Sequence, residues 1–208
     1  MARPFLTDAT KKALAGAVQA GEAGSSAELV ISVRPSSGYY LHADLLAGLT
    51  AAFAALAVLL YSPWTFGLVW FIVDPLIAAA LGVLVSSRTP GLRRLLTPPA
   101  VRRRQVETAA RAMFVEKRIH RTTGRTGILL YISLLEREAA VVVDLGVEAV
   151  AATASWKEAV AGIEEAVRRG DDGAAVARRI EALAALLSPV LPRSADDVDE
   201  LANEVDEQ

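Results

Sequence analysis

Asp144 and Glu148 stand four positions apart just after an apolar run, and their side chains are the ones in this chain best suited to chemistry. Carboxylate oxygens that lie close together at the end of a strand can hold a divalent cation. In the alternative interpretation Asp144 caps a turn and Glu148 is solvated, because one or two carboxylates seldom form a cation site without further protein oxygens. Both residues are therefore candidates for a catalytic or metal-binding role, with a divalent cation as the cofactor.

Histidine, serine and cysteine chemistry has less support. His42 and His120 are the two histidines, and they flank different segments, so they cannot form a zinc site without carboxylates. Ser36, Ser37 and Ser133 have no histidine partner visible in the sequence, so a serine triad is not indicated. The chain contains no cysteine, which excludes disulfides, thiolate metal sites and a cysteine nucleophile.

A long apolar region must be accommodated before any site can be placed. No charged residue occurs from Leu45 to Val73, and after Asp74 the uncharged run resumes from Pro75 to Ser87. This is too long for one span, since about 20 residues cross the hydrocarbon core of a bilayer. The sequence predicts two transmembrane helices, about 42–61 and 66–87, which form a hairpin over residues 42–88.

Aromatic and basic residues flank the predicted spans. Arginines that follow the second span place that side in the cytoplasm, and a hairpin returns the chain to the side it left. We therefore expect an inner-membrane protein with two spans and a cytoplasmic soluble domain. Membrane lipids are the expected partners of the basic flank, and nucleic acid is not, because no recognition motif surrounds it. The predicted membrane-interface residues are Tyr61, Trp64, Trp70, Arg88, Arg93 and Arg94.

Asp74 has two interpretations. Inside a span its charge would need protonation or a partner, which makes an intramembrane acid a functional hypothesis. Near the far surface it would be the N-cap of a helix that has Pro75 in its first turn. The neighbouring aromatic residues favour the second interpretation.

The remaining segments predict one α/β domain divided by the hairpin. Residues 27–33, 128–134 and 139–143 are apolar, strand-like runs, and the first cannot satisfy its edges unless it rejoins the other two after the hairpin. Helices are expected at 7–19, after Pro98-Pro99, at 155–169 with a capping box from Ser155 to Glu158, and at 174–187. The two parts of the domain are thus 1–41 and 89–192, and residues 193–208, with seven acids and one base, form an acidic tail expected to be disordered.

Several of these residues resemble the TPM-domain family, and in particular bacterial membrane-bound members whose domain is interrupted by two spans. The resemblance covers nearly the whole chain outside the tail. It rests on Thr7-Asp8, on Ser25 to Ile31, on the block TGILLYISLLER from Thr126 to Arg137, on Asp144 to Val147 and on Trp156. It implies an α/β/α sandwich with a small mixed sheet. Thylakoid-lumen relatives are associated with phosphatase activity, and other members act as accessory or assembly factors.

Two functions follow as hypotheses. The first is a non-enzymatic accessory or quality-control module that binds a protein partner at the cytoplasmic face of the membrane. Where many relatives have a GYGLE segment and a further acidic residue, this chain has Asp144-Leu-Gly-Val-Glu148 and then no acid before Ser155. The alternative is a weak metal-dependent phosphatase that uses Asp144 and Glu148, with Arg125 or Arg137 attracting the phosphate ester.

Overall fold

The computed structural model describes Phe5, residues 7–193 and residues 206–207 of the 208-residue chain. Its contacts divide the chain into two compact units, one formed by residues 1–37 together with 103–208 and the other by residues 38–102. The first unit is thus built from two separate stretches of sequence. The second is inserted between them, and it includes residues on both sides of the predicted hairpin.

A mixed sheet forms the centre of the first unit. The strands are β1 (Glu28–Arg34), β2 (Gly127–Ser133), β3 (Glu138–Val143) and the two-residue β4 (Asp206–Glu207), in the order β3-β2-β1-β4. β1 pairs in parallel with β2, from Glu28 opposite Gly127 to Arg34 opposite Ser133, and β2 pairs antiparallel with β3. The prediction that the first strand rejoins the later two is confirmed.

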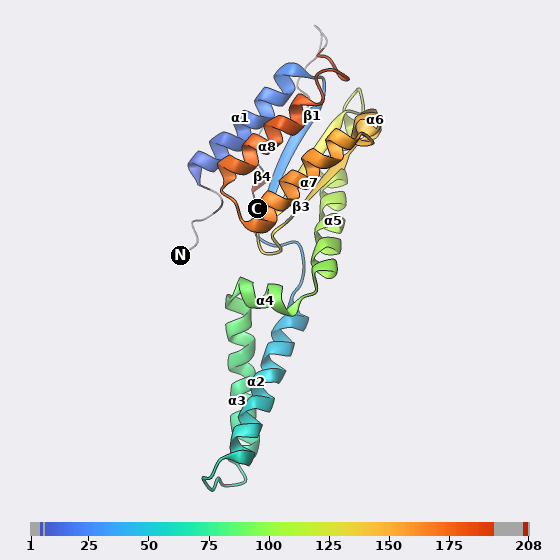
Figure 1. The fold of residues 1–208 in the computed structure, drawn as a ribbon. Coiled ribbons are helices and arrows are strands. Elements are labelled where there is room, and N and C mark those ends of the chain that lie inside the picture. The colour runs from blue at the N-terminus through green and yellow to red at the C-terminus, as the bar shows by residue number, and fades with distance from the viewer. Residues whose placement is uncertain (1–4, 6, 194–205, 208) are drawn as a thin grey trace. The chain divides into compact units, whose positions relative to one another are not determined.

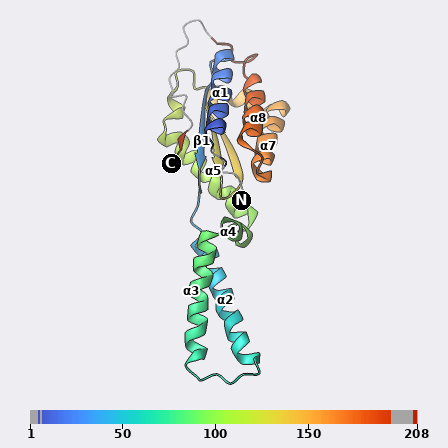
Figure 2. The same ribbon diagram turned by 90° about the vertical axis from the view of Figure 1, so that its left-hand side faces the viewer.

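Helices cover both faces of this sheet, which confirms the α/β/α fold. α1 (Asp8–Gly24), α7 (Ala154–Arg169) and α8 (Gly173–Ala185) pack on the face formed by alternate residues such as Ile31 and Leu130. The last turns of α5 (Pro99–Glu116) pack on the other face, against Leu129 and Tyr131. Figure 2 shows α5 on one side of the strands and α7 and α8 on the other. Side chains of successive strand residues point to opposite faces, so the almost unbroken apolar runs of β1 and β2 serve both cores.

Short helical turns complete the unit. The 3₁₀ turn η1 (Ile119–Arg121) follows α5, and η2 (Leu145–Val147) and α6 (Glu148–Ala151) connect β3 to α7. Thr7 caps α1 by accepting a hydrogen bond from the Thr10 N–H at 3.1 Å. The predicted capping box of α7 is wrong. Thr153 is the N-cap, and it accepts from Trp156 N–H at 3.3 Å, whereas Ser155 lies within the first turn.

The second unit is a helical hairpin with a short third helix. α2 (Leu41–Tyr61) and α3 (Trp70–Arg88) lie side by side, and α4 (Pro90–Leu96) follows α3 at the end away from the connecting loop (Figure 1). The backbones approach closely at two glycines. A Cβ atom at Gly48 would lie 2.8 Å from the Ala79 carbonyl oxygen, and one at Gly82 would lie 2.8 Å from the Ala47 carbonyl oxygen.

The structure corrects the expectation for Asp74. α3 begins at Trp70, so Asp74 lies inside the helix rather than at its N-cap, and Pro75 is also inside. The helix starts earlier because the N–H groups of Trp70 and Phe71 bond to the carbonyls of Gly67 and Leu68, which turns the chain before Pro75 is reached. Pro75 is the sixth residue of α3, beyond the first four N–H groups that have no helical partner, so its missing donor removes one helical hydrogen bond, to the Phe71 carbonyl.

The C-terminal segment lies mostly outside the described residues. The expectation of a disordered tail therefore stays a prediction for residues 194–205 and 208. Asp206 and Glu207 are described, and they form β4, which pairs in parallel with Ser32 and Val33 of β1.

Candidate functional site

Asp144, the first of the predicted site residues, forms a bidentate ion pair with Arg125. Arg125 donates from Nε to Oδ2 at 2.9 Å and from an Nη atom to Oδ1 at 3.0 Å. The Leu145 N–H also donates to Oδ1, at 2.8 Å. The Asp144 side chain is only 4% exposed, whereas that of Arg125 is 51% exposed. Both carboxylate oxygens of Asp144 are therefore engaged by protein donors.

The conformation of the loop before β2 orients the guanidinium of Arg125 toward Asp144. Arg125 has a left-handed backbone, with φ of 53°, and its carbonyl accepts a hydrogen bond from the Gly146 N–H at 2.8 Å. Two glycines permit this arrangement. A Cβ atom at Gly146 would lie 2.6 Å from the Gly124 carbonyl oxygen, and one at Gly127 would overlap the Ile119 carbonyl oxygen. Only glycine fits where backbone approaches backbone so closely.

The ion pair sets the protonation state of Asp144. Burial acts to raise the pKa of this carboxyl group, but the hydrogen bonds from Arg125 and from the Leu145 N–H outweigh it, so the pKa lies below its ordinary value of 3.8. The charge of Arg125 and that of His120 act in the same direction. Asp144 is accordingly an ionised, paired carboxylate at neutral pH.

Glu148, the second predicted site residue, is placed differently. It is exposed and begins α6, while Asp144 is buried and caps η2 through its hydrogen bond to Leu145. Within the described residues no cluster of three or more histidine, aspartate or glutamate side chains has a geometry that could hold a metal ion. A divalent-cation site at Asp144 and Glu148 stays a prediction, and it would require Asp144 to exchange Arg125 for the cation.

Arg125 and Arg137, the two arginines considered for phosphate binding, lie at opposite ends of β2. Arg125 precedes the first residue of the strand, and Arg137 lies in the turn after its last residue. Seven strand residues at about 3.3 Å each separate the two by roughly 20 Å. Arg125 is beside Asp144, so of the two arginines only Arg125 can act together with it.

A second polar cluster, which we call the Glu136 network, lies where β1 and β2 end. Glu136 is fully buried and accepts hydrogen bonds from the Ser37 N–H at 2.8 Å and from the Ser133 hydroxyl. Ser37 Oγ donates to Ser133 Oγ at 2.7 Å and lies 3.0 Å from the Tyr131 hydroxyl. Since the Ser37 hydrogen is directed at Ser133, Tyr131 is the donor to Ser37. Burial raises the pKa of Tyr131, which keeps the phenol protonated for that role.

Sequence reasoning did not identify the Glu136 network. It judged Ser37 and Ser133 only as parts of a triad with histidine, and it did not include Glu136 among the candidate site residues. The network holds the segment that leaves β1 against the turn between β2 and β3, together with backbone bonds from Leu134 N–H to the Arg34 carbonyl and from Leu135 N–H to the Pro35 carbonyl, both at 2.9 Å. Among the described residues, the Glu136 network thus fixes the point at which the chain leaves the sheet.

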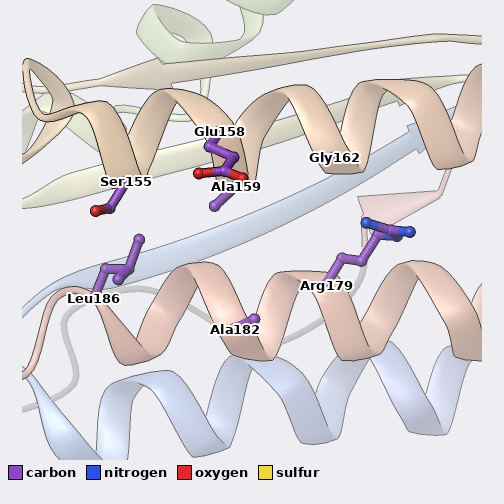
Figure 3. A pocket seen from close by; sticks show the side chains of 7 residues that line it. All are labelled: Ser155, Glu158, Ala159, Gly162, Arg179, Ala182 and Leu186. Atoms are coloured by element: carbon purple, nitrogen blue, oxygen red, sulfur yellow. The ribbon is translucent and has the colours of Figure 1, made fainter.

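A groove of about 310 Å³ lies between α7 and α8 (Figure 3). Its walls are small or apolar along most of its length, and its charged groups are Glu158 from α7 and Arg179 from α8. Arg179 reaches toward Gly162, where a Cβ atom would lie 3.0 Å from its Nη1. The lining residues are Ser155, Glu158, Ala159, Gly162, Arg179, Ala182 and Leu186. Ser155 and Glu158, which the sequence suggested as a cap, are thus groove residues.

The second unit has a buried ion pair of its own. Asp44 of α2 accepts from Ser86 of α3 at 2.7 Å and from Arg93 of α4 at 2.6 and 3.0 Å. His42, two residues before Asp44 in the same turn of α2, has its Nε2 3.2 Å from Thr97 Oγ1. These contacts connect all three helices at the end of the hairpin where α4 lies. They also give Arg93 a protein partner, although the sequence placed it among the membrane-interface residues.

The other predicted interface residues separate to the two ends of the hairpin. Tyr61, Trp64 and Trp70 lie at the loop end and are 89%, 73% and 50% exposed. Arg88 ends α3, and Arg94 lies in α4 beside Arg93, at the opposite end. Contact of either group with a membrane surface stays a prediction.

Fold and site together define a class of protein. The chain has an α/β/α unit with a small mixed sheet, and this unit is interrupted in sequence by two helices that are long and apolar enough to cross a membrane. Residues 88–186 match the model of the TPM domain. This match confirms the resemblance to the TPM-domain family for that part of the chain.

Comparison with solved structures agrees on the fold. The chain is similar to the NMR structure of the BA42 protein from the psychrophilic bacterium Bizionia argentinensis, with a TM-score of 0.60 and 15% sequence identity, over 100% of this chain and 99% of that one. A likeness at this identity concerns the fold alone. None of the curated proteins matches the chain.

Proposed function

We propose that this protein is a membrane-anchored TPM-domain module in which α2 and α3 cross the inner membrane and the α/β unit acts in the cytoplasm as a non-enzymatic accessory or assembly factor. Membrane lipids and a protein partner are its expected ligands. The observation that carries the proposal is the apolar, outward-facing surface of both helices of the hairpin.

That surface is large and nearly free of charge. Apart from the face where the two helices meet, most large side chains of the hairpin are exposed, and after Asp44 the only charged residue before Arg88 is Asp74. Burying such a surface in lipid is favourable by about 25 cal/mol per Å² of apolar area. The outward-facing residues that are more than half exposed include Leu45, Leu49, Phe53, Val58, Leu60, Ile72, Leu76 and Leu81.

The charge pattern supports the orientation. The stretch from Arg88 to Arg125 contains eleven Arg or Lys residues and two acids, and the loop from Ser62 to Val69 contains none of either. Basic residues close to a span remain in the cytoplasm during insertion. The loop end, with Trp64, would then face the opposite side.

The state of Asp144 supports an accessory role over catalysis. A nucleophile or a metal ligand needs an accessible lone pair, whereas the Asp144 side chain is only 4% exposed and its oxygens accept hydrogen bonds from Arg125 and from the Leu145 N–H. The exposed Glu148 alone offers one carboxylate, which is too few ligands for a stable cation site. The alternative function, a weak metal-dependent phosphatase, draws support from Arg125, because its half-exposed guanidinium could attract a phosphate ester.

The absence of native cysteine allows a direct test of the anchor and its orientation. In cells, Ser62→Cys in the loop should react with a membrane-impermeant maleimide, whereas Thr123→Cys, on the exposed loop before β2, should react only after permeabilisation. The chain should also remain in the membrane fraction after extraction with alkaline carbonate. Release by carbonate, or labelling of Thr123→Cys in intact cells, would overturn the anchor or its orientation, respectively.

A separate assay tests the accessory role. We expect the full-length protein in detergent to show no hydrolysis of p-nitrophenyl phosphate above the buffer rate, with or without Mg²⁺, Mn²⁺ or Ca²⁺. Hydrolysis that is lost in Asp144→Asn and retained in the control Glu165→Gln, an exposed site on α7, would establish the phosphatase alternative.

A further inference from the structure

β3 is the terminal strand of the sheet, and within the described part of the chain its outer edge has no strand beside it. The Asp144 N–H donates to the Gly127 carbonyl of β2 at 3.0 Å. Backbone groups of an antiparallel pair alternate in direction, so Val142 and Ala140 also bond to β2, and Ala139, Val141 and Val143 direct their N–H and C=O groups away from it. Among the described strands none pairs with β3 on that side.

A hollow of about 330 Å³ lies along this edge. Its lining comes from α5 on one face of the sheet, from α7 on the other face, and from Val141 between them, which is possible only at the rim of a sheet. Trp156 and Val160 form its apolar part, and the complete lining is Arg103, Val141, Ala151, Trp156, Lys157, Val160, Ala161 and Glu164.

Apart from Glu138, its first residue, which pairs with Arg168, β3 has none of the devices that prevent pairing with another strand. Charged residues, proline or a bulge normally protect a sheet edge, and residues 139–143 are Ala-Ala-Val-Val-Val. Val141, Val142 and Val143 are each partly exposed. An uncharged, β-branched edge of this kind is a template for a further strand.

The charged residues beside the outer edge of β3 indicate which strand would pair with it. α7 runs antiparallel to β3, because Arg168 near its end bonds to Glu138 at the start of β3. Lys157 therefore lies toward Val143 and Glu164 toward Glu138, with Val141 between them. A twofold rotation about Val141 exchanges these ends and brings each Lys157 beside Glu164 of the other copy. The two ends of this edge are thus complementary to each other in charge, and Arg103 of α5 also lies in the hollow, where it interacts with Glu164 of its own copy.

We propose that β3 pairs antiparallel with β3 of a second copy of this chain, about a twofold axis at Val141, so that the two sheets become one. The pairing adds backbone hydrogen bonds at Ala139, Val141 and Val143 and closes the two hollows against each other. The dimer does not depend on the membrane anchor, so the two proposals can fail separately.

Disulfide trapping tests the register. In the full chain in detergent, Val141→Cys should cross-link to its own copy on mild oxidation, because residues that exchange both hydrogen bonds have Cα atoms about 5.5 Å apart. The matched control is Val142→Cys, which faces Ala140 of the other copy. Its own counterpart lies about 8 Å away, by the spacings of strands and residues, beyond the reach of a disulfide. Absence of the Val141→Cys dimer, or equal cross-linking of the control, would overturn this pairing.

A charge exchange tests the axis without cysteine. Light scattering in detergent should give a dimer for the wild type, and Lys157→Glu or Glu164→Lys should weaken the dimer about tenfold in Kd, because each places like charges together twice. The double variant, Lys157→Glu with Glu164→Lys, should restore the wild-type value. A monomeric wild type, or a double variant as weak as the single ones, would exclude the dimer. Cross-linking of Val141→Cys to a different protein in cells would assign the edge to that partner instead.

Discussion

Arg125 and Asp144, nineteen residues apart in sequence, meet as a bidentate pair with one member buried and the other half exposed. The pair closes the loop between η1 and β2 over the end of β3. The buried charge of Asp144 is balanced by the half-exposed guanidinium of Arg125. The pair therefore contributes to the stability of the fold, and it also restrains chemistry at Asp144.

Replacing Asp144 by asparagine should produce a pH-dependent loss of stability. The pKa of Asp144 in the folded state is lowered, so its contribution is complete above its ordinary pKa of 3.8 and is lost as the pH falls through the lower folded value. We expect Asp144→Asn to reduce the free energy of unfolding by about 1–3 kcal/mol at pH 7. Urea unfolding of the full chain in detergent, at pH 7 and at pH 3, should show this difference shrinking in acid. Glu148→Gln, at an exposed position, is the control, and an Asp144→Asn effect that is constant with pH would contradict the assignment.

Glu136 should be the most sensitive glutamate of the α/β unit. Glu136→Ala removes the acceptor of the Ser37 N–H and the Ser133 hydroxyl in a buried place, and unsatisfied donors of this kind cost about 1–3 kcal/mol each. We expect a loss of about 3 kcal/mol in denaturant unfolding. Glu165→Ala, which removes only an exposed pair with Arg168, should change stability by less than about 1 kcal/mol. Similar losses of stability in Glu136→Ala and Glu165→Ala would show that the buried Glu136 network contributes no more to stability than an exposed ion pair.

Substitutions at Thr153 and Ser155 test which of the two residues caps α7. Thr153→Ala removes the side-chain acceptor of the Trp156 N–H and should cost about 1 kcal/mol. Ser155→Ala should lie within about 0.5 kcal/mol of the wild type, because Ser155 is exposed in the first turn. Thermal unfolding followed by circular dichroism measures both, and a larger effect at Ser155 would restore the capping box predicted from the sequence.

The helical hairpin should depend on its glycines. Gly48→Leu adds a Cβ atom that would lie 2.8 Å from the Ala79 carbonyl oxygen, and the rest of the leucine side chain beyond it. α2 and α3 must therefore separate. We expect the hairpin to lose about 1–3 kcal/mol, measured by thermal unfolding in detergent. Ala54→Leu, an equally apolar enlargement at an exposed position of α2, should be neutral. If Gly48→Leu were also neutral, the close approach of the two helices would not be needed.

Much of the fold could be predicted because its signals are local. The apolar runs of β1, β2 and β3, the cap at Thr7 and the cap at Asp172, which accepts from Ala175 N–H at 2.7 Å, depend on residues only a few positions apart. The mixed sheet followed from one argument, that a lone strand before the hairpin needs partners. The start of α3 was less predictable, because Pro75 usually marks a first turn and the backbone bonds to Gly67 and Leu68 leave no trace in the sequence.

The site was harder because its partners are distant in sequence. Asp144 was identified as a candidate, but its partner Arg125 is aimed by a left-handed backbone that residue types alone do not specify. Glu136 stands beside Arg137 and Glu138, in a charged stretch typical of a solvent-exposed turn. Its burial depends on Ser37, 99 positions earlier, and on the parallel pairing that brings the ends of β1 and β2 together.

The parallel pairing of β1 with β2 also sets an order of events during synthesis. Every paired residue of β2 follows its β1 partner by 99 positions, as Gly127 follows Glu28. At the usual 5–20 residues per second, β1 waits about 5–20 s for β2 to be made, and the whole hairpin emerges in that interval. The apolar helices are therefore available to the insertion machinery before the sheet can close. If the hairpin crosses a membrane as proposed above, its insertion in this window would keep β1 tethered beside the bilayer, and the α/β unit would then complete its fold there.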